Sequence, residues 1–387
     1  MKAWDRFYTY SSSIIRAANT PNNPRYETLW PVPFTHPIHG HPFPILRYLY
    51  LRIEHLEQFL IAAPLLHYGL THLEICLSTI NPDTLPPLQD LLIAVTENCP
   101  NLQVLAFNYV FSVSAPRKVT FLPSILARMK ELRHLRLSHD AVSYAGLLET
   151  LGELKNLEYL RLDSRSLLQW RSVSLREDAF PKILTLAIYP CEGSLDLLLK
   201  QNFPLRSLRR LEVRNYSSKH HHAFLGALRD SSITELLLFF LPDMTPPTAT
   251  DLRPISNLKN LQILEIDAFF ALQITDLQFD SFVQSCPRLH KLTLITRLMG
   301  NLTLLSIFSA VLHCPEINFI DLSILATQLP LIDAAQLKTI TSRNPVKGAG
   351  VLPHIDMPMG RWRMVAKSQV EVWLSKFCVA VDVCSGY

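Results

Sequence analysis

The chain contains 387 residues, of which 48% are hydrophobic and 18% charged, and its formal net charge is +4. This composition supplies a large core and excludes a disordered polyelectrolyte. The near balance of 37 basic and 33 acidic residues argues against an obligate nucleic-acid-binding protein. Leucine, with 68 residues, is the one strong excess.

The sequence also carries signals about its compartment. The first 20 residues have no apolar stretch of signal-peptide length, and the densest apolar run, residues 236–241, is too short to span a bilayer. The seven cysteines form no paired framework, and several lie in apolar patterns that favour a buried, reduced thiol. We therefore expect a soluble cytoplasmic or nuclear protein with no membrane partner.

The chain begins with a segment that differs from the rest of the sequence. Residues 1–44 are rich in proline from Pro21 onward and have no clear periodicity. From residue 45 to 342, the pattern Leu-x-x-Leu-x-Leu recurs eleven times with conservative replacements. Its first positions are Leu46, Leu70, Leu102, Leu132, Leu157, Ile183, Leu208, Ile233, Leu261, Leu289 and Ile317. Chance matches would be scattered, whereas these settle at intervals of 25 to 28 residues from Leu132 onward.

The spacing has a physical explanation. The last three residues of each pattern suit a short strand with alternate side chains inward, and the remainder can return through one helix and two turns. Helical periodicity occupies residues 53–66, 88–95, 144–154, 193–203, 279–286 and 302–312. The sequence therefore predicts an α/β leucine-rich-repeat solenoid, or horseshoe, with parallel inner strands and outer helices in about eleven irregular repeats.

Three junctions between helix and strand share the pattern Cys-Pro-x-Leu/Ile, beginning at Cys99, Cys286 and Cys314. Proline ends the helix, and the cysteine before it is a small apolar residue suited to fill space in the core. These cysteines are too far apart in sequence for the usual zinc motifs. After the array, residues 343–387 end in an apolar run, and we assign them to a C-terminal cap or tail.

The period and the Cys-Pro-x-Leu junctions resemble the leucine-rich-repeat region of F-box proteins. Short segments such as Phe180-Pro181-Lys182-Ile183 most resemble those of the F-box-like families of basidiomycete fungi. The resemblance covers residues 40–345 and implies that the repeats capture a protein substrate of a ubiquitin ligase, with the F-box docked on a Skp1-type adaptor. Residues 1–44 contain no recognisable F-box, although residues 25–30 resemble the end of one, so we do not extend Skp1 binding to this chain.

The sequence lacks the common motifs of catalysis and metal binding. It has no phosphate-binding glycine loop, no nucleophile elbow and no His-Glu-x-x-His. Ser138-His139-Asp140 are sequence neighbours that cannot converge as a triad. Residues 220–222 open an expected helix, on which successive histidines diverge, and His36, His39 and His41 lack a nearby fourth ligand. We predict no enzyme activity, no cofactor and no metal site.

The repeats also lack the usual asparagine or cysteine ladder eight residues after each first leucine, where only Cys191 fits. We therefore expect irregular turns in which backbone groups find other partners.

Strand positions between the inward leucines should face the concave side and form a binding surface for a protein partner. The candidates are His134, Arg136, Tyr159, Arg161, Asp163, Tyr189, Arg210, Glu212, Arg214, Glu235, Glu265 and Asp267. Tyrosine and arginine are favoured anchors of protein interfaces, although a polar outer face is also ordinary in a soluble protein. Two alternatives stay open: an enzyme built on the scaffold, and nucleic-acid binding through the arginines of residues 206–214.

Overall fold

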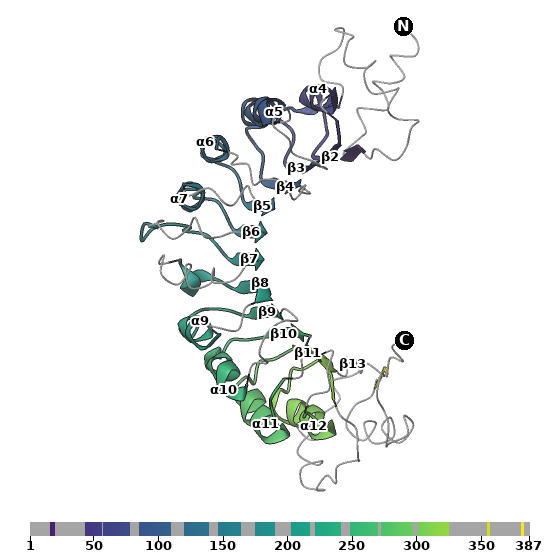
Figure 1. Ribbon diagram of the computed structural model, residues 1–387, viewed down its shortest axis with the longest axis vertical. Coiled ribbons are helices and arrows are strands. Elements are labelled where there is room, and N and C mark those ends of the chain that lie inside the picture. The colour runs from purple at the N-terminus through teal and green to yellow at the C-terminus, as the bar shows by residue number, and fades with distance from the viewer. Residues whose placement is uncertain are drawn as a thin grey trace. The chain divides into compact units, whose positions relative to one another are not determined.

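The computed structural model describes the strand of every predicted repeat. The described residues are 16–19, 43–55, 57–77, 85–109, 120–138, 146–163, 175–189, 203–216, 221–240, 248–269, 272–296, 301–324, 354–356 and 381–382. The chain divides into two compact units. Unit 1 comprises Met1–Tyr189 and Lys200–Pro204, and unit 2 comprises Pro190–Leu199 and Leu205–Tyr387. In Figure 1 the elements of unit 1 run from purple to teal and those of unit 2 from teal through green to yellow.

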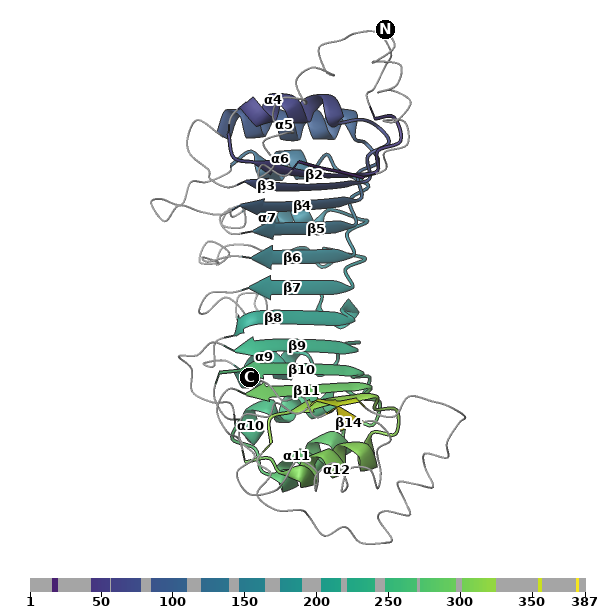
Figure 2. The same cartoon turned by 90° about the vertical axis from the view of Figure 1, so that its right-hand side faces the viewer.

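Unit 1 contains a parallel sheet whose strands follow the order of the chain. Each strand pairs in parallel with the next one. The strands are β1 (Arg16–Asn19), β2 (Tyr48–Ile53), β3 (His72–Leu77), β4 (Val104–Tyr109), β5 (His134–Ser138), β6 (Tyr159–Asp163) and β7 (Thr185–Tyr189). Figure 2 shows the arrows from β3 to β7 side by side and pointing the same way. Parallel neighbours need a crossover connection between them, which the long repeat period supplies.

Unit 2 has the same construction. Its strands also pair in parallel and in chain order. They are β8 (Arg210–Tyr216), β9 (Glu235–Phe240), β10 (Ile263–Ala268), β11 (Lys291–Thr296), β12 (Phe319–Leu322), β13 (His354–Asp356) and β14 (Val381–Asp382). Strands β2 to β12 are the eleven that the repeat pattern predicts, so the predicted strand positions and their parallel direction are confirmed.

Most of the connections between repeat strands contain a helix, and these helices lie on one side of each sheet (Figure 1), although none is described between β6 and β7. In unit 1 they are α4 (Glu57–Ala62), which continues as the 3-10 helix η1 (Ala63–Leu65), then α5 (Leu85–Asn98), α6 (Leu122–Leu126) and α7 (Leu147–Gly152). In unit 2 they are η5 (Leu205–Ser207), α9 (His221–Ala227), α10 (Ala249–Leu252), which continues as η7 (Arg253–Asn257), then α11 (Asp276–Gln284) and α12 (Leu304–His313). Each unit is therefore a run of α/β leucine-rich repeats.

The core lies between sheet and helices. Leu135, Leu160 and Leu186 occupy matching positions on neighbouring strands, and each is 0% exposed. On the helix side, Leu148 and Leu151 of α7 are equally buried. Every second side chain of a strand points to the same face. The predicted alternation of inward and outward side chains along the strands is therefore the one observed.

The helices differ from the prediction mainly in length. The helix predicted at residues 144–154 is α7, which covers Leu147–Gly152, whereas the one predicted at 88–95 is the longer α5, Leu85–Asn98. α11 begins with a capping box, in which the Thr275 side chain accepts from Gln278 N–H and the Gln278 side chain accepts from Thr275 N–H. Most of the helix predicted at 193–203 lies outside the described residues.

Most repeats enter their strand through the same turn. Leu132 N–H donates to the Met129 carbonyl at 3.2 Å, which closes a tight turn before β5. The carbonyl of Gln103, in the preceding repeat, accepts from the N–H groups of both Arg133 and His134, at 2.8 and 2.9 Å. Equivalent pairs of hydrogen bonds enter β3, β4, β6, β7, β9, β10, β11 and β12. A backbone ladder therefore satisfies the polar groups at the strand entrances.

Two asparagines add to this ladder before the strand. Asn101 Nδ2 donates to the Tyr68 carbonyl at 3.0 Å, and Asn156 Nδ2 donates to the Lys130 carbonyl at 3.1 Å. Each bond joins one repeat to the repeat before it. Most of the residues at the position expected for a ladder after the strand lie outside the described residues.

Few residues are described at the two ends of the chain. β1 lies within the predicted segment 1–44, and β13 and β14 lie within the predicted tail 343–387. The sequence did not suggest these strands, because none of them carries the repeat pattern. Residues 25–30, which resemble the end of an F-box, and the histidines at 36, 39 and 41 lie outside the described residues.

Candidate functional site

We use the term open face for the strand residues that point away from the buried leucines, which in unit 1 include His134, Arg136, Tyr159, Arg161, Asp163 and Tyr189. Arg136 of β5 and Arg161 of β6 are register partners, as the repeat pattern predicts. One carboxylate, that of Asp163, contacts both arginines. Arg161 Nε donates to Asp163 Oδ1 and Oδ2 at 3.1 and 3.3 Å, and Arg136 Nε lies 3.9 Å from Oδ2.

The two arginines are not equivalent. The side chain of Arg161 is 20% exposed and that of Arg136 is 38% exposed, while that of Asp163 is 13% exposed. Burial of the Arg161 guanidinium opposes its charge, but the hydrogen bond and the charge of Asp163 outweigh it, so the pKa of Arg161 is raised. Two guanidinium groups therefore face one carboxylate, which leaves one positive charge in excess at this point of the open face.

Aromatic rings surround the arginine pair. His134 and Tyr159 stack with centroids 5.6 Å apart and an interplanar angle of 17°. The Arg161 guanidinium lies over the Tyr189 ring, 4.3 Å from its centroid. Such contacts hold the guanidinium in a fixed orientation while leaving part of the rings accessible.

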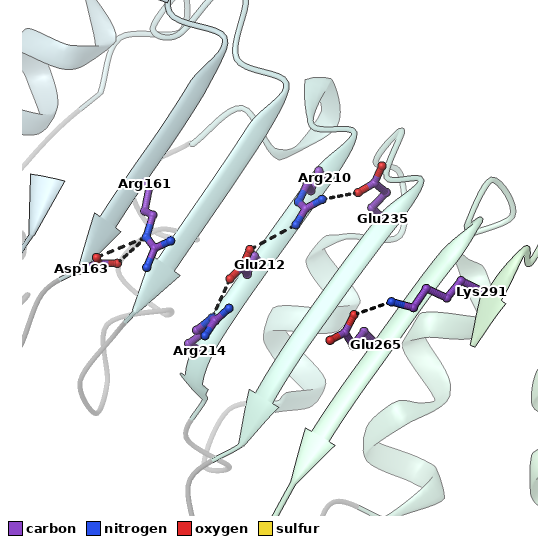
Figure 3. A network of polar contacts seen from close by, with 8 residues as sticks. All are labelled: Arg161, Asp163, Arg210, Glu212, Arg214, Glu235, Glu265 and Lys291. Atoms are coloured by element: carbon purple, nitrogen blue, oxygen red, sulfur yellow. Dashed lines mark hydrogen bonds and ion pairs between the residues drawn. The ribbon is translucent and has the colours of Figure 1, made fainter. Parts of the chain in front are cut away.

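The open face of unit 2 has a different charge pattern, which Figure 3 shows. Glu212 of β8 lies between two arginines of its own strand. Its Oε1 accepts from Arg214 Nε at 2.7 Å, and its Oε2 lies 3.5 Å from Arg210 Nη2. Arg210 also reaches Glu235 of β9, with Nη1 donating to Oε2 at 2.8 Å. The residues predicted for one surface thus form an ion-pair network within unit 2.

Glu212 is the most buried member of this network, at 7% exposure. Burial raises its pKa, but the hydrogen bond and charge of Arg214 and the charge of Arg210 act more strongly in the other direction, so the pKa of Glu212 is lowered overall. The carboxylate is therefore ionised at neutral pH and orients both arginines. Its burial and its two partners make it a positioning residue of the surface.

A separate ion pair joins β10 and β11. Lys291 Nζ donates to Glu265 Oε2 at 3.3 Å and lies 5.3 Å from the centroid of the Phe319 ring. Arg214 lies over the Phe239 ring at 4.4 Å. Asp267, predicted for this surface, is half-buried on β10. The four carboxylates named for unit 2 thus outnumber the three cations by one.

Sequence reasoning missed three residues of this surface: Phe239, Lys291 and Phe319. All three occupy the same alternate strand positions as the predicted residues, as their registers show. The alternation rule could have selected them, whereas their pairing with particular charges depends on side-chain directions that the sequence does not specify.

Other sequence features have structural roles. The Ser138 hydroxyl donates to the Phe107 carbonyl at 3.2 Å, and the rest of the Ser138-His139-Asp140 phrase lies outside the described residues. Cys314 Sγ donates to the Cys286 carbonyl at 3.4 Å. Burial raises the pKa of the Cys99, Cys286 and Cys314 thiols to about 12. These cysteines are buried and fill space in the core of the repeats.

Metal-binding and membrane-spanning features are both missing from the described part of the chain. Within those segments, no group of three or more histidines, cysteines and carboxylates is placed to hold a metal ion. Among the same residues, none of the helices combines the length and the apolar character needed to cross a membrane.

Comparisons with known proteins add little to this picture. No protein-family model and no curated protein matches the sequence. Among solved structures, a chain of the crystal structure of the Rad7 and Elc1 complex in yeast matches 84% of this chain and 72% of its own length, at 14% identity and a TM-score of 0.41. A likeness at this level carries no conclusion about function, and the fold assignment rests on the strand order, register and burial described above.

Proposed function

We propose that this chain is a protein-interaction module and that the open face of unit 1 binds an acidic segment of a partner protein. The observation that carries the proposal is the arginine pair of β5 and β6. Arg136 and Arg161 are register neighbours, yet they share a single carboxylate, Asp163. A carboxylate from a partner would complete the charge balance.

The geometry suits a protein ligand. Arg136 keeps 38% of its side chain exposed, and its only ion pair among the described residues is the 3.9 Å approach to Asp163. A guanidinium offers a planar fork that can bind a carboxylate in two places. The His134–Tyr159 stack beside it provides rigid apolar surface, and such aromatic residues are favoured anchors of protein interfaces.

The network of unit 2 supports a complementary role. Glu235 and Glu265 are half-buried, with side chains 31% and 24% exposed, and each already holds one cation. Basic residues of a partner would meet these two carboxylates, whereas Glu212 would hold Arg210 and Arg214 in place.

We further propose, on the resemblance to F-box leucine-rich-repeat proteins, that the captured protein is a substrate for ubiquitin transfer in the cytoplasm or nucleus. The chain would act as a substrate receptor or as a relative without the adaptor module. A pull-down with a Skp1-type adaptor tests this finer proposal independently of partner capture. Retention of the adaptor supports a ligase receptor, and its absence supports the adaptor-less relative.

Affinity capture from cell extract tests the main proposal. Arg136→Ala is the cleanest variant, because Asp163 keeps its hydrogen bonds to Arg161. We expect recovery of the partner to fall several-fold, and the difference from wild type to shrink at high salt because the interaction is ionic. Asp163→Asn should raise recovery, because it removes the competing charge and keeps a hydrogen-bond acceptor.

The matched control is the double variant Arg128→Ala with Arg176→Ala. Both arginines are exposed, with side chains 52% and 71% accessible, and both are outside the open face. Equal recovery by wild type, Arg136→Ala and this control would refute the proposal. Recovery that disappears after nuclease treatment would instead favour the nucleic-acid alternative.

A further inference from the structure

A hollow of about 420 Å³ lies within unit 2, between η7 and α11 and above β10 and β11. Figure 1 places α10, which leads directly into η7, next to α11 on the helix side. Ile255 and Phe279, which are 0% and 1% exposed, belong to its floor. Ile274 and Phe282 line it closer to the surface. The hollow is separate from the open face, because it is built by the opposite, helix-bearing side of the sheet.

The sequence explains why this space is not filled. After four residues of α10 the chain continues as a 3-10 helix, with Pro254 in its first turn. A 3-10 helix is narrower than an α-helix and rarely extends beyond a few residues. The neighbouring α11 is a regular α-helix of nine residues. A short, narrow element therefore lies beside a longer and wider one.

Most polar groups at the mouth are engaged within the chain. The Ser281 hydroxyl donates to the Leu277 carbonyl at 3.1 Å, and the Ser285 hydroxyl donates to the Ser281 carbonyl at 3.0 Å. Gln278 Oε1 accepts from Thr275 N–H at 3.0 Å in the capping box. These groups make the rim polar, but their hydrogen bonds within the chain mean that they do not require a polar ligand.

Arg253 is the exception at the mouth. It lines the hollow, and its side chain is exposed. Among the residues whose side chains the structure describes, no carboxylate forms an ion pair with its guanidinium. An apolar hollow with one uncompensated cation at its edge is complementary to a ligand with an apolar body and one negative charge.

We propose that this hollow binds a small apolar carboxylate, with the apolar body between η7 and α11 and the carboxylate on Arg253. The volume of about 420 Å³ lies at the lower end of the range for small-molecule pockets, about 300–1,000 Å³. A medium-length fatty acid such as dodecanoate has that size and that chemistry. The proposal concerns a second site and does not depend on partner capture by unit 1.

Calorimetric titration of the full chain with dodecanoate and with dodecanol tests the proposal. We expect one equivalent of dodecanoate to bind, and dodecanol to bind more weakly. Arg253→Gln should weaken dodecanoate binding by up to about fivefold, the upper value for an exposed ion pair, and should make acid and alcohol nearly equal. Ser285→Trp should abolish binding of both, because the indole would fill the hollow from the C-cap position of α11.

Arg229→Gln is the matched control, because Arg229 is an exposed arginine of the same unit that does not line the hollow. Circular dichroism establishes that each variant is folded. Absence of dodecanoate binding to the wild type would overturn the proposal. Equal losses in Arg253→Gln and Arg229→Gln, or binding of several equivalents that Ser285→Trp does not reduce, would overturn it as well.

Discussion

Leu160→Ala is the most informative perturbation of the repeat core. Leu160 is 0% exposed on β6, and its register partners Leu135 and Leu186 are equally buried. Loss of three buried carbons costs about 2.4 kcal/mol by transfer alone, at about 0.8 kcal/mol for each. Strand pairing on both sides restrains the neighbours from closing the cavity. We therefore expect a total cost of about 3–5 kcal/mol, in the upper part of the range for such substitutions.

Urea unfolding followed by circular dichroism measures this cost. For a slope of about 2 kcal/mol per M, the midpoint should fall by roughly 1.5–2.5 M. Leu277→Ala is the control, because Leu277 is 77% exposed and its loss should change stability by no more than about 0.5 kcal/mol. Hydrogen exchange should accelerate in β5, β6 and β7 together, because repeats are coupled to their neighbours. An unchanged midpoint for Leu160→Ala would refute the strand register and the burial inferred from it.

Two further predictions concern titratable groups. Glu212→Gln should destabilise unit 2 by about 1–3 kcal/mol, because Arg210 and Arg214 lose a charged acceptor. Since the pKa of Glu212 is lowered in the fold, its contribution is present above the ordinary value of 4.5 and is lost as the pH falls through the lowered value. Acid unfolding below about pH 4.5 should therefore differ between wild type and variant, and identical acid profiles would contradict the pairing. The thiols of the three Cys-Pro junctions, whose pKa values are raised to about 12, should resist alkylation at pH 8 in the native protein and react after denaturation. Because the pKa of these thiols is raised in the fold, the free energy of unfolding should decline as the pH rises above about 9. Rapid alkylation of these cysteines in the native protein would contradict their burial.

The repeated core could be predicted from the sequence because its cause is local and periodic. Leu135 and Leu160 recur 25 residues apart, and the alternation of one strand fixes which side chains are inward. The same rule placed Arg136 and Arg161 at matching positions, which the register confirms. Prediction succeeds here because each repeat must bury the same face against its neighbour.

The parts that could not be predicted depend on contacts between side chains or on weak local signals. Asp163 lies two residues from Arg161 on the same strand, and only the side-chain directions determine that they pair. Likewise, the helical periodicity of the sequence did not predict a helix at residues 249–257, where four residues of α10 continue as the 3-10 helix η7. β1, β13 and β14 lack the leucine pattern, so sheet pairing alone defines them.

Photo-crosslinking in cells tests most directly whether the open face of unit 1 binds a partner. A photoreactive phenylalanine derivative replaces Tyr159, which lies on that face, or Tyr68, which is 71% exposed in the turn before β3. We predict a discrete protein adduct from position 159, little or none from position 68, and loss of the adduct when Arg136→Ala is added. Equal adducts from the two positions, or an adduct at position 159 that Arg136→Ala leaves unchanged, would contradict partner binding at this face.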